Sequence, residues 1–443
     1  MSDLFSIGLS GIRAYQRALS TVSSNISNAE NPDYVRRDLR LSELSTTASV
    51  NPYYTSQINF GGVDIDGVAR ASDPFLEANV RMTGASLYGA ETRARWMANI
   101  ETSLNDTEHG VGSKLSKLFA MGEELAGAPF NNILRNQFIS DFDAAVTAMN
   151  RTANDLATLS DQIIGAAEQE VAVFNDALDN LAKTNLALRS TADGSTKQAA
   201  LLDQRDTALA VISERMDVTI SFADKGVANI SYAGQSLVNV GQTNALSVTA
   251  AGDGTIGLVV GGAAVSAPSR GSLAAMVLSA ATNSDRRAGL DNLAVQFAAD
   301  VNGWQAAGET DGGVPGAPLL DATGGAAALA LVSTDPADLA LAAPGGAASG
   351  NIMAFADLRG PAGSEQAWAN IISAQAITTA SARNENAAAM TQHQAAREAR
   401  DSLSSVELDR EAADLLRFQD AYNASARVIQ VARETMQSIL AIF

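Results

Sequence analysis

The sequence predicts a mainly α protein with a small β domain: terminal helices forming a coiled coil, a long-helix bundle, and an inserted, mostly β outer domain. Three observations support this fold class. Apolar residues repeat every seven positions at both ends of the chain, which is the spacing of a coiled-coil seam. A long central stretch has apolar residues at three- and four-residue steps, which is the helical period. A later stretch consists of short strand-like runs between turn residues.

The first predicted helix carries a seam counted in sevens from Phe5. On periodicity alone, an amphipathic helix docked on its own domain is the favoured explanation. The helix is predicted to end at the asparagines of SNISNAENPDYVRR (24–37), where Pro32 fits the second position of a turn. That turn is expected to direct Tyr34, Arg36 and Arg37 away from the helix axis. The seam comprises Phe5, Ile12, Leu19 and Ile26 with Gly8, Tyr15, Val22 and Ala29, and the turn motif comprises Asn28, Asn31, Pro32 and Tyr34.

The last predicted helix carries a second seam, which continues to Phe443. Ser404 and Glu407 fit a capping box at its start, although this helix could equally continue from the helical segment before it. The two seams have matching periods, so they can pair with each other or with copies of themselves. The predicted assembly interface comprises Phe5, Ile12, Tyr15, Leu19, Val22, Ile26, Leu408, Leu415, Phe418, Tyr422, Ile429, Met436, Ile439 and Phe443.

The stretch from Ser86 to Arg205 is predicted to be helical and to break around Gly127 and Pro129. Returning helices near 286–304 and 365–400 would complete a bundle. We therefore expect three domains, which suits the length of 443 residues. Their predicted ranges are 1–45 with 403–443 for the terminal coiled coil, 46–210 with 271–402 for the helical bundle, and 211–270 for the small β outer domain.

Five strand-like runs are predicted between 217 and 268: VTISFA, VANISYA, SLVNVG, ALSVTA and IGLVVGG. The G-x-G-x-x-G sequence at 252–257 precedes a strand instead of a helix, which argues against a dinucleotide site. Asp253-Gly254 is instead predicted to be a hairpin turn. Residues 308–350 are rich in Gly, Ala and Pro, so we expect exposed loops with short strands.

The composition excludes several classes of partner and site. There are 49 acidic and 30 basic residues, giving a net charge of −19, which disfavours binding to nucleic acid or to an anionic membrane surface. No apolar run approaches the roughly twenty residues of a membrane span, so no membrane insertion is expected. The chain contains no cysteine, and its start lacks the pattern of a secretory signal. We expect that any export uses no cleaved signal peptide.

Catalysis has little support in the sequence. His109 and His393 are the two histidines, and each stands in a polar context. Carboxylates are abundant, but no pair stands out from the general acidity. The acidic ETDGG sequence (309–313) lacks the ligand spacing of an EF-hand loop. The sequence therefore predicts no catalytic residues, no cofactor and no metal site, and the protein is predicted not to be an enzyme.

Two terminal segments resemble the bacterial flagellar axial proteins, the family of rod, hook and hook-associated subunits. The segment GLSGIRAYQRALSTVSSNISNAENPDYVRR (8–37) is similar to the family's N-terminal motif, and VELDREAADLLRFQDAYNASARVIQVARETMQSIL (406–440) to its C-terminal motif. Three interior segments resemble the hook-associated members. They are LLDQRD (201–206), VNGWQAAGETDGG (301–313) and FADLRG (355–360). Asp33 departs from the family pattern, because it replaces a glycine; this disfavours a type II turn and suggests a type I turn or a left-handed aspartate. Arg37 replaces a common glutamine, and the chain is short for a hook-associated member.

The resemblance implies a structural subunit of the extracellular flagellum at the hook–filament junction, which assembles through its terminal helices after export by the flagellar secretion apparatus. It also implies specific partners: copies of the chain in a ring or helical tube, the flagellar hook protein, the second hook–filament junction protein, and an export chaperone on the C-terminal helix. Two alternatives stay open. A flagellar hook or distal-rod protein would share the terminal motifs but have a mainly β interior, and an exported hydrolase would use flagellar-type termini only as an export address.

Overall fold

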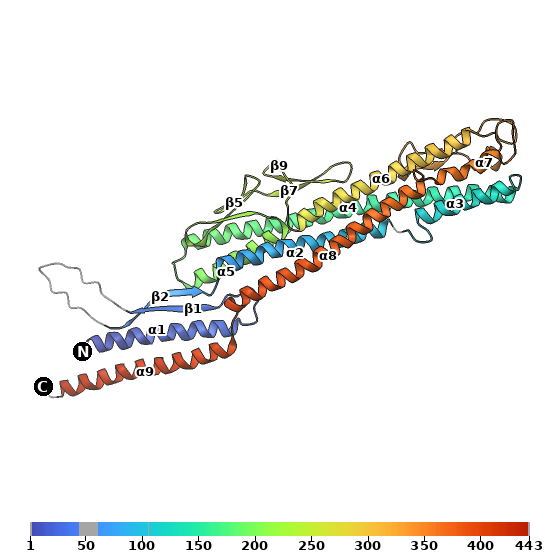
Figure 1. Ribbon diagram of the computed structural model, residues 1–443. Helices are drawn as coiled ribbons and strands as arrows, with labels where there is room; N and C mark the ends of the chain where they lie inside the picture. Colours follow the sequence, from blue (N-terminus) through green and yellow to red (C-terminus); the bar gives the residue numbers. More distant parts are fainter. Residues whose placement is uncertain (1, 44–60, 105, 442–443) are drawn as a thin grey trace. The chain divides into compact units, whose positions relative to one another are not determined.

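The computed structural model describes residues 2–43, 61–104 and 106–441 (Figure 1). Long α-helices dominate these ranges, and the strands form small antiparallel sheets. The predicted fold class, mainly α with long terminal helices and a small inserted β region, is confirmed. Within the described ranges, none of the helices combines the length and the apolar character that a membrane span requires.

The chain divides into two compact units, each assembled from separate segments. Unit 1 comprises 1–84, 174–245 and 391–443, and unit 2 comprises 85–173 and 246–390. The division falls inside three long helices, α2 (Pro74–Ser103), α4 (Asn132–Ser190) and α8 (Ser364–Ser404). It follows a different partition from the predicted domain boundaries, which stay a prediction.

Unit 1 contains the two terminal helices, a two-stranded ribbon and a four-stranded sheet. The sheet has the order β3-β4-β5-β6 with antiparallel neighbours. Asn185 on α4 fixes it, because its Nδ2 donates to the carbonyls of Ala228 (2.8 Å) and Val240 (3.0 Å). The elements are α1 (Ser2–Ser27), β1 (Arg37–Glu43), β2 (Val63–Arg70), α5 (Thr196–Arg215), β3 (Thr219–Phe222), the 3-10 helix η1 (Asp224–Gly226), β4 (Ala228–Tyr232), β5 (Gln235–Asn239), β6 (Gln242–Thr243) and α9 (Leu408–Leu440), with parts of α2, α4 and α8.

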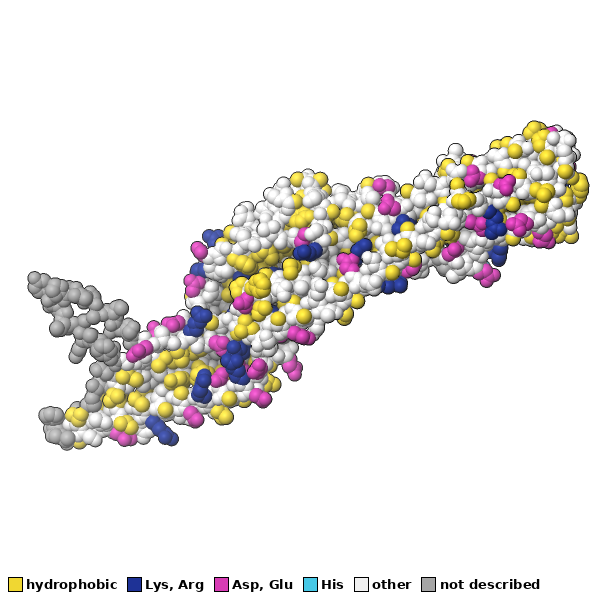
Figure 2. Space-filling view, in the orientation of Figure 1, with side chains coloured by type: hydrophobic (Ala, Val, Ile, Leu, Met, Phe, Trp, Pro, Cys, Tyr) yellow, Lys and Arg dark blue, Asp and Glu magenta, His cyan; other side chains and the backbone are white. Residues whose placement is uncertain are grey.

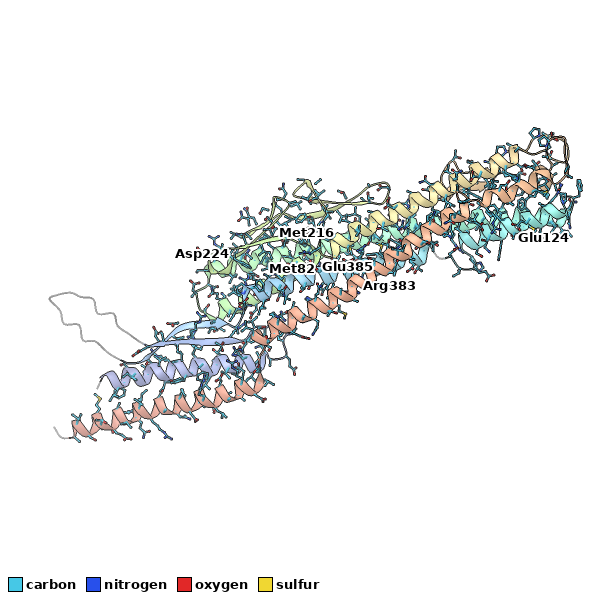
Figure 3. The ribbon with its side chains drawn as sticks, viewed as in Figure 1. Met82, Glu124, Met216, Asp224, Arg383 and Glu385 are labelled. Carbon is cyan, nitrogen blue, oxygen red and sulfur yellow. The ribbon has the colours of Figure 1, made fainter. Side chains whose placement is uncertain are left out.

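Unit 2 is a helical bundle with a second small sheet, ordered β7-β8-β9. Ion pairs join α2 to α8 on its surface: Arg93 pairs with Glu385, and Arg383 Nη2 lies 3.2 Å from Glu101 Oε2. Figure 3 marks Arg383 and Glu385 on α8. The further elements of unit 2 are α3 (Val111–Gly127), β7 (Leu246–Ala250), β8 (Ile256–Val260), β9 (Ala263–Val265), α6 (Ser272–Ala306), β10 (Leu320–Asp321), η2 (Ala326–Ala328), β11 (Ala330–Leu331), η3 (Pro336–Asp338), α7 (Gly350–Ala354) and η4 (Phe355–Arg359).

The core of unit 2 is a cluster of aromatic rings. Phe138 contacts Phe142, Phe355 and Trp304 with ring centroids 4.8, 5.2 and 6.2 Å apart. Phe119 on α3 adds a contact of 5.1 Å to Phe355. The phenylalanine side chains are almost completely buried. Edge-to-face rings add attraction to the burial of their area, so this cluster stabilises the unit.

Several predicted elements are confirmed. The break near Gly127 separates α3 from α4, and each of the five predicted strands overlaps a strand of the structure. The hairpin turn at Asp253-Gly254 joins β7 to β8, with Gly254 at φ +86° and the N–H of Ala251 donating to the carbonyl of Thr255 at 3.0 Å. Two helix breaks were not predicted. They lie at 104–110 and 191–195.

The prediction of exposed loops for 308–350 is wrong in part. Leu339, Ala340 and Leu341 are buried, because polar groups of α6 and α7 hold this backbone against the bundle. Gln305 Nε2 donates to the carbonyl of Asp338 (2.6 Å), and Asn351 Nδ2 donates to the carbonyl of Ala340 (2.7 Å). The small residues that suggested a loop instead allow the chain to lie close to the helices.

Candidate assembly interface

The two terminal helices, α1 and α9, pair in antiparallel orientation (Figure 1). Gly8 lies opposite Ile429, and Tyr15 packs on Phe418 with ring centroids 6.4 Å apart. Further along, Asn25 of α1 donates a hydrogen bond from Nδ2 to Glu411 Oε2 at 3.0 Å. The contacts run in opposite directions along the two helices, so the pair is held together over most of the length of α1.

Small residues of α1 form the centre of this contact. A Cβ atom added to Gly8 would lie 2.6 Å from Cγ1 of Ile429, and one added to Gly11 would lie 2.7 Å from Oγ of Ser425. Close approach of this kind requires residues with little or no side chain on one helix. The buried positions of α1 recur every three or four residues; they are Gly8, Gly11, Ala14, Ala18, Val22 and Asn25.

The predicted seam residues take several positions relative to this contact. Of the large side chains predicted on α1, Val22 alone is buried, and those of Phe5, Ile12, Tyr15, Leu19 and Ile26 are half-buried. On α9, Leu415, Phe418, Tyr422 and Ile429 are half-buried, whereas Leu408, Met436 and Ile439 are exposed. Phe443 lies outside the described residues. Counting apolar residues in sevens therefore found contact residues of α9, such as Phe418 and Ile429, but on α1 it found mainly the flank of the contact. The small residues of α1 at the centre were missed except Gly8.

A second apolar face of α9 lies opposite the first. At about 100° per residue, Leu416, Val428 and Val431 lie on the side of α9 away from Ile429. Leu416 and Val431 are 62% and 58% exposed. A groove of about 630 Å³ follows this face, lined by Leu4, Asp420, Asn423, Ala424, Arg427, Val428 and Val431. Figure 2 shows apolar side chains gathered over the terminal helices.

The turn after α1 holds itself together with side-chain hydrogen bonds. Asn28 Nδ2 donates to the carbonyl of Ser24 at 2.8 Å, and Asn31 Oδ1 accepts from the N–H of Asp33 at 3.1 Å. Pro32 is exposed. Asp33 has negative φ, so the left-handed alternative for this residue is wrong.

The prediction that Tyr34 points away from the helix is also wrong. Its hydroxyl donates to Asn25 Oδ1 at 2.8 Å, and its ring lies under Arg37 with 4.6 Å between the guanidinium carbon and the ring centroid. Burial raises the pKa of the Tyr34 hydroxyl above its ordinary value. The turn therefore folds the chain back onto α1, because Asn25 offers a buried acceptor there.

Asn25 is a functional candidate that the sequence analysis missed. It is 1% exposed, and its side chain joins α1 to the following turn, to β1 and to α9. Nδ2 donates to the carbonyl of Arg37 (2.9 Å) and to Glu411, while Oδ1 accepts from the N–H of Arg37 (3.1 Å) and from Tyr34. The available signal was a polar residue standing inside a helical stripe of apolar and small residues.

The predicted capping box of α9 is wrong. Ser404 is the last residue of α8, and its hydroxyl donates to the carbonyl of Arg400 at 3.0 Å. Helix α9 begins at Leu408 after Glu407, which makes no side-chain cap. The carbonyl of Ser404 instead accepts from the N–H of Arg36 at 2.9 Å, so the link between α8 and α9 is tied to the start of β1.

Neither histidine lies in a recognisable catalytic arrangement. His109 is exposed, and His393 is half-buried with its Nδ1 3.2 Å from the Thr83 hydroxyl. Burial lowers the pKa of His393, and the charges of Arg397 and Arg400 lower it further. Within the described residues, no three His, Asp or Glu side chains form a group able to hold a metal ion.

Comparison with known families decides the identity of the fold. The family described as "Flagellar hook-associated protein FlgK helical domain" matches residues 97–320, just over half of the 443-residue chain. The chain belongs to this FlgK family. Residues 400–442, which include the whole of α9, match a second family, described as "Flagellar basal body rod FlgEFG protein C-terminal". FlgK-family proteins are structural components of the flagellum.

Individual FlgK-family relatives are distant from this chain in sequence. Flagellar hook-associated protein 1 of Salmonella typhimurium is 28% identical over 241 residues, covering 54% of this chain and 43% of the relative. Its counterpart in Bacillus subtilis is 26% identical over 349 residues, covering 71% and 69%. A solved structure of the FlgK from Burkholderia pseudomallei is 20% identical, with a TM-score of 0.49, 55% of this chain and 46% of that chain covered. The chain thus spans less than half the length of the Salmonella relative.

Proposed function

We propose that this chain is a structural subunit of the bacterial flagellum that joins the hook to the filament. It assembles through α1 and α9 after export by the flagellar secretion apparatus, and it works as part of the extracellular flagellum. Membership of the FlgK family and the name of its relatives, flagellar hook-associated protein 1, support this proposal. The proposed role is structural, with no catalytic step.

The observation that carries the proposal is the second apolar face of α9. Helix α1 covers only one side of α9, and Leu416, Val428 and Val431 are left exposed on the other. Full burial of a Leu or Val side chain contributes roughly 1.5–3 kcal/mol, so covering this face in an assembly is favourable. Exposed apolar side chains that share one helix face with polar residues such as Asp420 and Arg427 are typical of an interaction site.

The proposed occupants of this face are copies of the same chain in a ring or helical tube. The flagellar hook protein on one side and the second hook–filament junction protein on the other are proposed as further neighbours. Before export, a chaperone is proposed to cover α9, because the apolar side chains that α1 leaves exposed would otherwise associate prematurely.

Val431→Asp tests the proposal. It places a charge on the outer face of α9 without touching the contact with α1. We expect a folded chain that fails to incorporate into flagella, measured by complementing a strain that lacks the native gene and labelling isolated flagella. Gln419→Asp is the matched control, because it adds the same charge at an exposed position outside the groove. Normal incorporation of the Val431 variant would sink the proposal.

The alternative of a hook or distal-rod protein predicts an interior made mainly of strands. The interior is instead formed by the long helices α2, α3, α4, α6 and α8. This observation argues for the hook–filament junction among the flagellar alternatives. Among the described residues, no feature favours the exported hydrolase.

A further inference from the structure

The β1–β2 ribbon places two buried arginines directly opposite each other. Arg37 on β1 and Arg70 on β2 are paired positions in the antiparallel register. Both side chains are only 7% exposed. Like charges at opposed positions of two strands repel each other, and burial removes the water that would screen them. The ribbon by itself therefore carries an uncompensated charge pair.

Asp203 on α5 lies between these two arginines. Its Oδ2 accepts a hydrogen bond from Arg37 Nη2 at 2.8 Å, and its Oδ1 lies 2.8 Å from Arg70 Nε. Each carboxylate oxygen thus serves one arginine. Among the described residues, Asp203 is the one carboxylate within ion-pair distance of Arg37, whereas Arg70 also pairs with Asp206 at 2.7 Å.

Arg37 also connects the ribbon to α1. Its N–H donates to Asn25 Oδ1, and its carbonyl accepts from Asn25 Nδ2. The same Nδ2 donates to Glu411 on α9. A continuous series of polar contacts therefore runs from Asp203 on α5 through Arg37 and Asn25 to Glu411, and it joins four elements of unit 1.

We infer that Asp203 is the positioning residue of the terminal helix pair: by neutralising Arg37 and Arg70 it docks the β1–β2 ribbon on α5, and through Arg37 it fixes α1 and α9. The segments YVRR and LLDQRD, 166 positions apart at the contacting residues, meet for this purpose. Removing one partner from a buried ion pair lowers the free energy of unfolding far more than replacing the whole pair with apolar residues does. The three charged residues therefore determine where the ribbon docks more than they add to stability.

Backbone contacts also hold β2 against the segment before α5, independently of Asp203. The N–H of Val68 donates to the carbonyl of Gly194 at 2.7 Å. Gly67 and Gly194 approach so closely that a Cβ on Gly67 would lie 2.7 Å from Cα of Gly194. These contacts hold β2 near the start of α5. They reach β1 only through its pairing with β2, whereas the side chain of Arg37 links β1 directly to α5.

Asp203→Asn in the full-length chain is the first test, read out by hydrogen exchange. We expect the amides of β1 and α1 to exchange on the order of a hundredfold faster, which matches the loss of one partner from a buried pair. The amides of α6 should keep their protection. Asp206→Asn is the matched comparison, one helical turn along α5: it removes one partner of Arg70 but leaves Arg37 with Asp203, so β1 and α1 should lose much less protection than in Asp203→Asn.

The second variant tests whether Asp203 acts through the arginines. In the triple variant Arg37→Met, Arg70→Met, Asp203→Leu, the repelling charges are gone and the ribbon needs no carboxylate. We expect protection of β1 and α1 to return to within about tenfold of the original chain, since apolar replacement of a buried ion cluster is often neutral. This variant also decides the question if Asp203→Asn alone does not fold.

Three results would overturn the inference: unchanged exchange of β1 and α1 in Asp203→Asn, equal acceleration throughout the chain, or failure of the triple variant to restore protection. The positioning role of Asp203 does not depend on the proposed function. Only the idea that α1 and α9 are positioned for assembly rests on it. If Asp203→Asn shows the expected exchange while Val431→Asp assembles normally, the inference stands and the proposed function fails. The reverse pattern would retain the function and discard the positioning role.

Discussion

The aromatic core of unit 2 and the α1–α9 pair of unit 1 use opposite packing strategies. In unit 2, large rings such as Phe138 and Phe355 are completely enclosed by neighbouring elements of the same unit. In the terminal pair, Gly8 and Gly11 lie at the centre, and the large side chains of α9 are half-buried or exposed. The first region is complete within one chain. The second has apolar surface left over, as expected of the proposed assembly element.

The difference also concerns polar groups. The terminal pair depends on a buried amide and a buried carboxylate, Asn25 and Glu411, which are 1% and 2% exposed. Buried polar groups of this kind specify which surfaces meet, whereas apolar burial supplies most of the stability. Three substitutions test the contrast, from the largest expected effect to the smallest.

Phe138→Ala should have the largest effect. The ring contacts three other aromatic residues, so its removal leaves a cavity and should lower the free energy of unfolding by about 3–5 kcal/mol. Urea unfolding followed by circular dichroism measures this. Ile133→Ala, on the same helix but 79% exposed, should change stability by less than about 0.5 kcal/mol. Similar losses for both variants would refute the enclosed-core description.

Gly8→Ala should have an intermediate effect, confined to the terminal pair. The added methyl group overlaps Ile429, so we expect a loss of about 1 kcal/mol and faster exchange of α1 amides. Gly165→Ala on α4 is the matched control, because a Cβ there meets open space. That control should gain roughly 0.5–1 kcal/mol, since alanine favours the helix. A gain at both positions would show that α1 and α9 are not in close contact.

Glu411→Gln should have the smallest effect, visible as a change in pH dependence. Burial raises the pKa of Glu411 above 4.5, and Asp414 and Asp38 raise it further, against the effects of Asn25 and Arg36. A raised pKa in the folded pair means that the neutral form is preferred. The contribution of Glu411 to stability is therefore greatest below about pH 4.5 and decreases as the pH rises through the folded-state pKa.

Glutamine keeps an acceptor for Asn25 and does not ionise. The variant should thus melt slightly higher than the original chain at neutral pH and lose this part of the pH dependence. Melting of the terminal pair, followed by calorimetry at several pH values, checks the prediction. Glu407→Gln is the control at an exposed position nearby. An unaltered pH profile in the Glu411 variant would mean that this carboxylate is adequately solvated.

Local patterns predicted much of the fold. The heptad spacing located α1 and α9, the strand-like runs located the two small sheets, and Asp253-Gly254 gave the β7–β8 turn. Each depends on neighbours within a few residues. Apart from Gly8, the small-residue centre of the α1–α9 contact was not found, because Gly11, Ala14 and Ala18 do not fall on the seven-residue count from Phe5.

The polar connections were missed for a different reason. Asn25 bonds to Glu411, which is 386 positions away, and Arg37 bonds to Asp203, 166 positions away. The periodicity of a short segment contains no information about contacts with distant segments. None of these four residues is an unusual residue type for the element in which it lies. The N-terminal motif placed Tyr34 and two arginines together, yet only the folded chain shows that Tyr34 bonds to Asn25 and Arg37 to Asp203, whereas Arg36 pairs with Asp38.

The Gly/Ala/Pro-rich tract at 308–350 has a practical consequence. Its composition resembles that of a linker, but Leu339 to Leu341 are buried. In addition, Arg135 donates two hydrogen bonds of 2.6 and 2.9 Å to Asp311. A fluorescent tag or epitope inserted near 339–341 would have to displace packed backbone. The turn at Gly345-Gly346 is exposed and offers a site where such a label fits without opening the bundle.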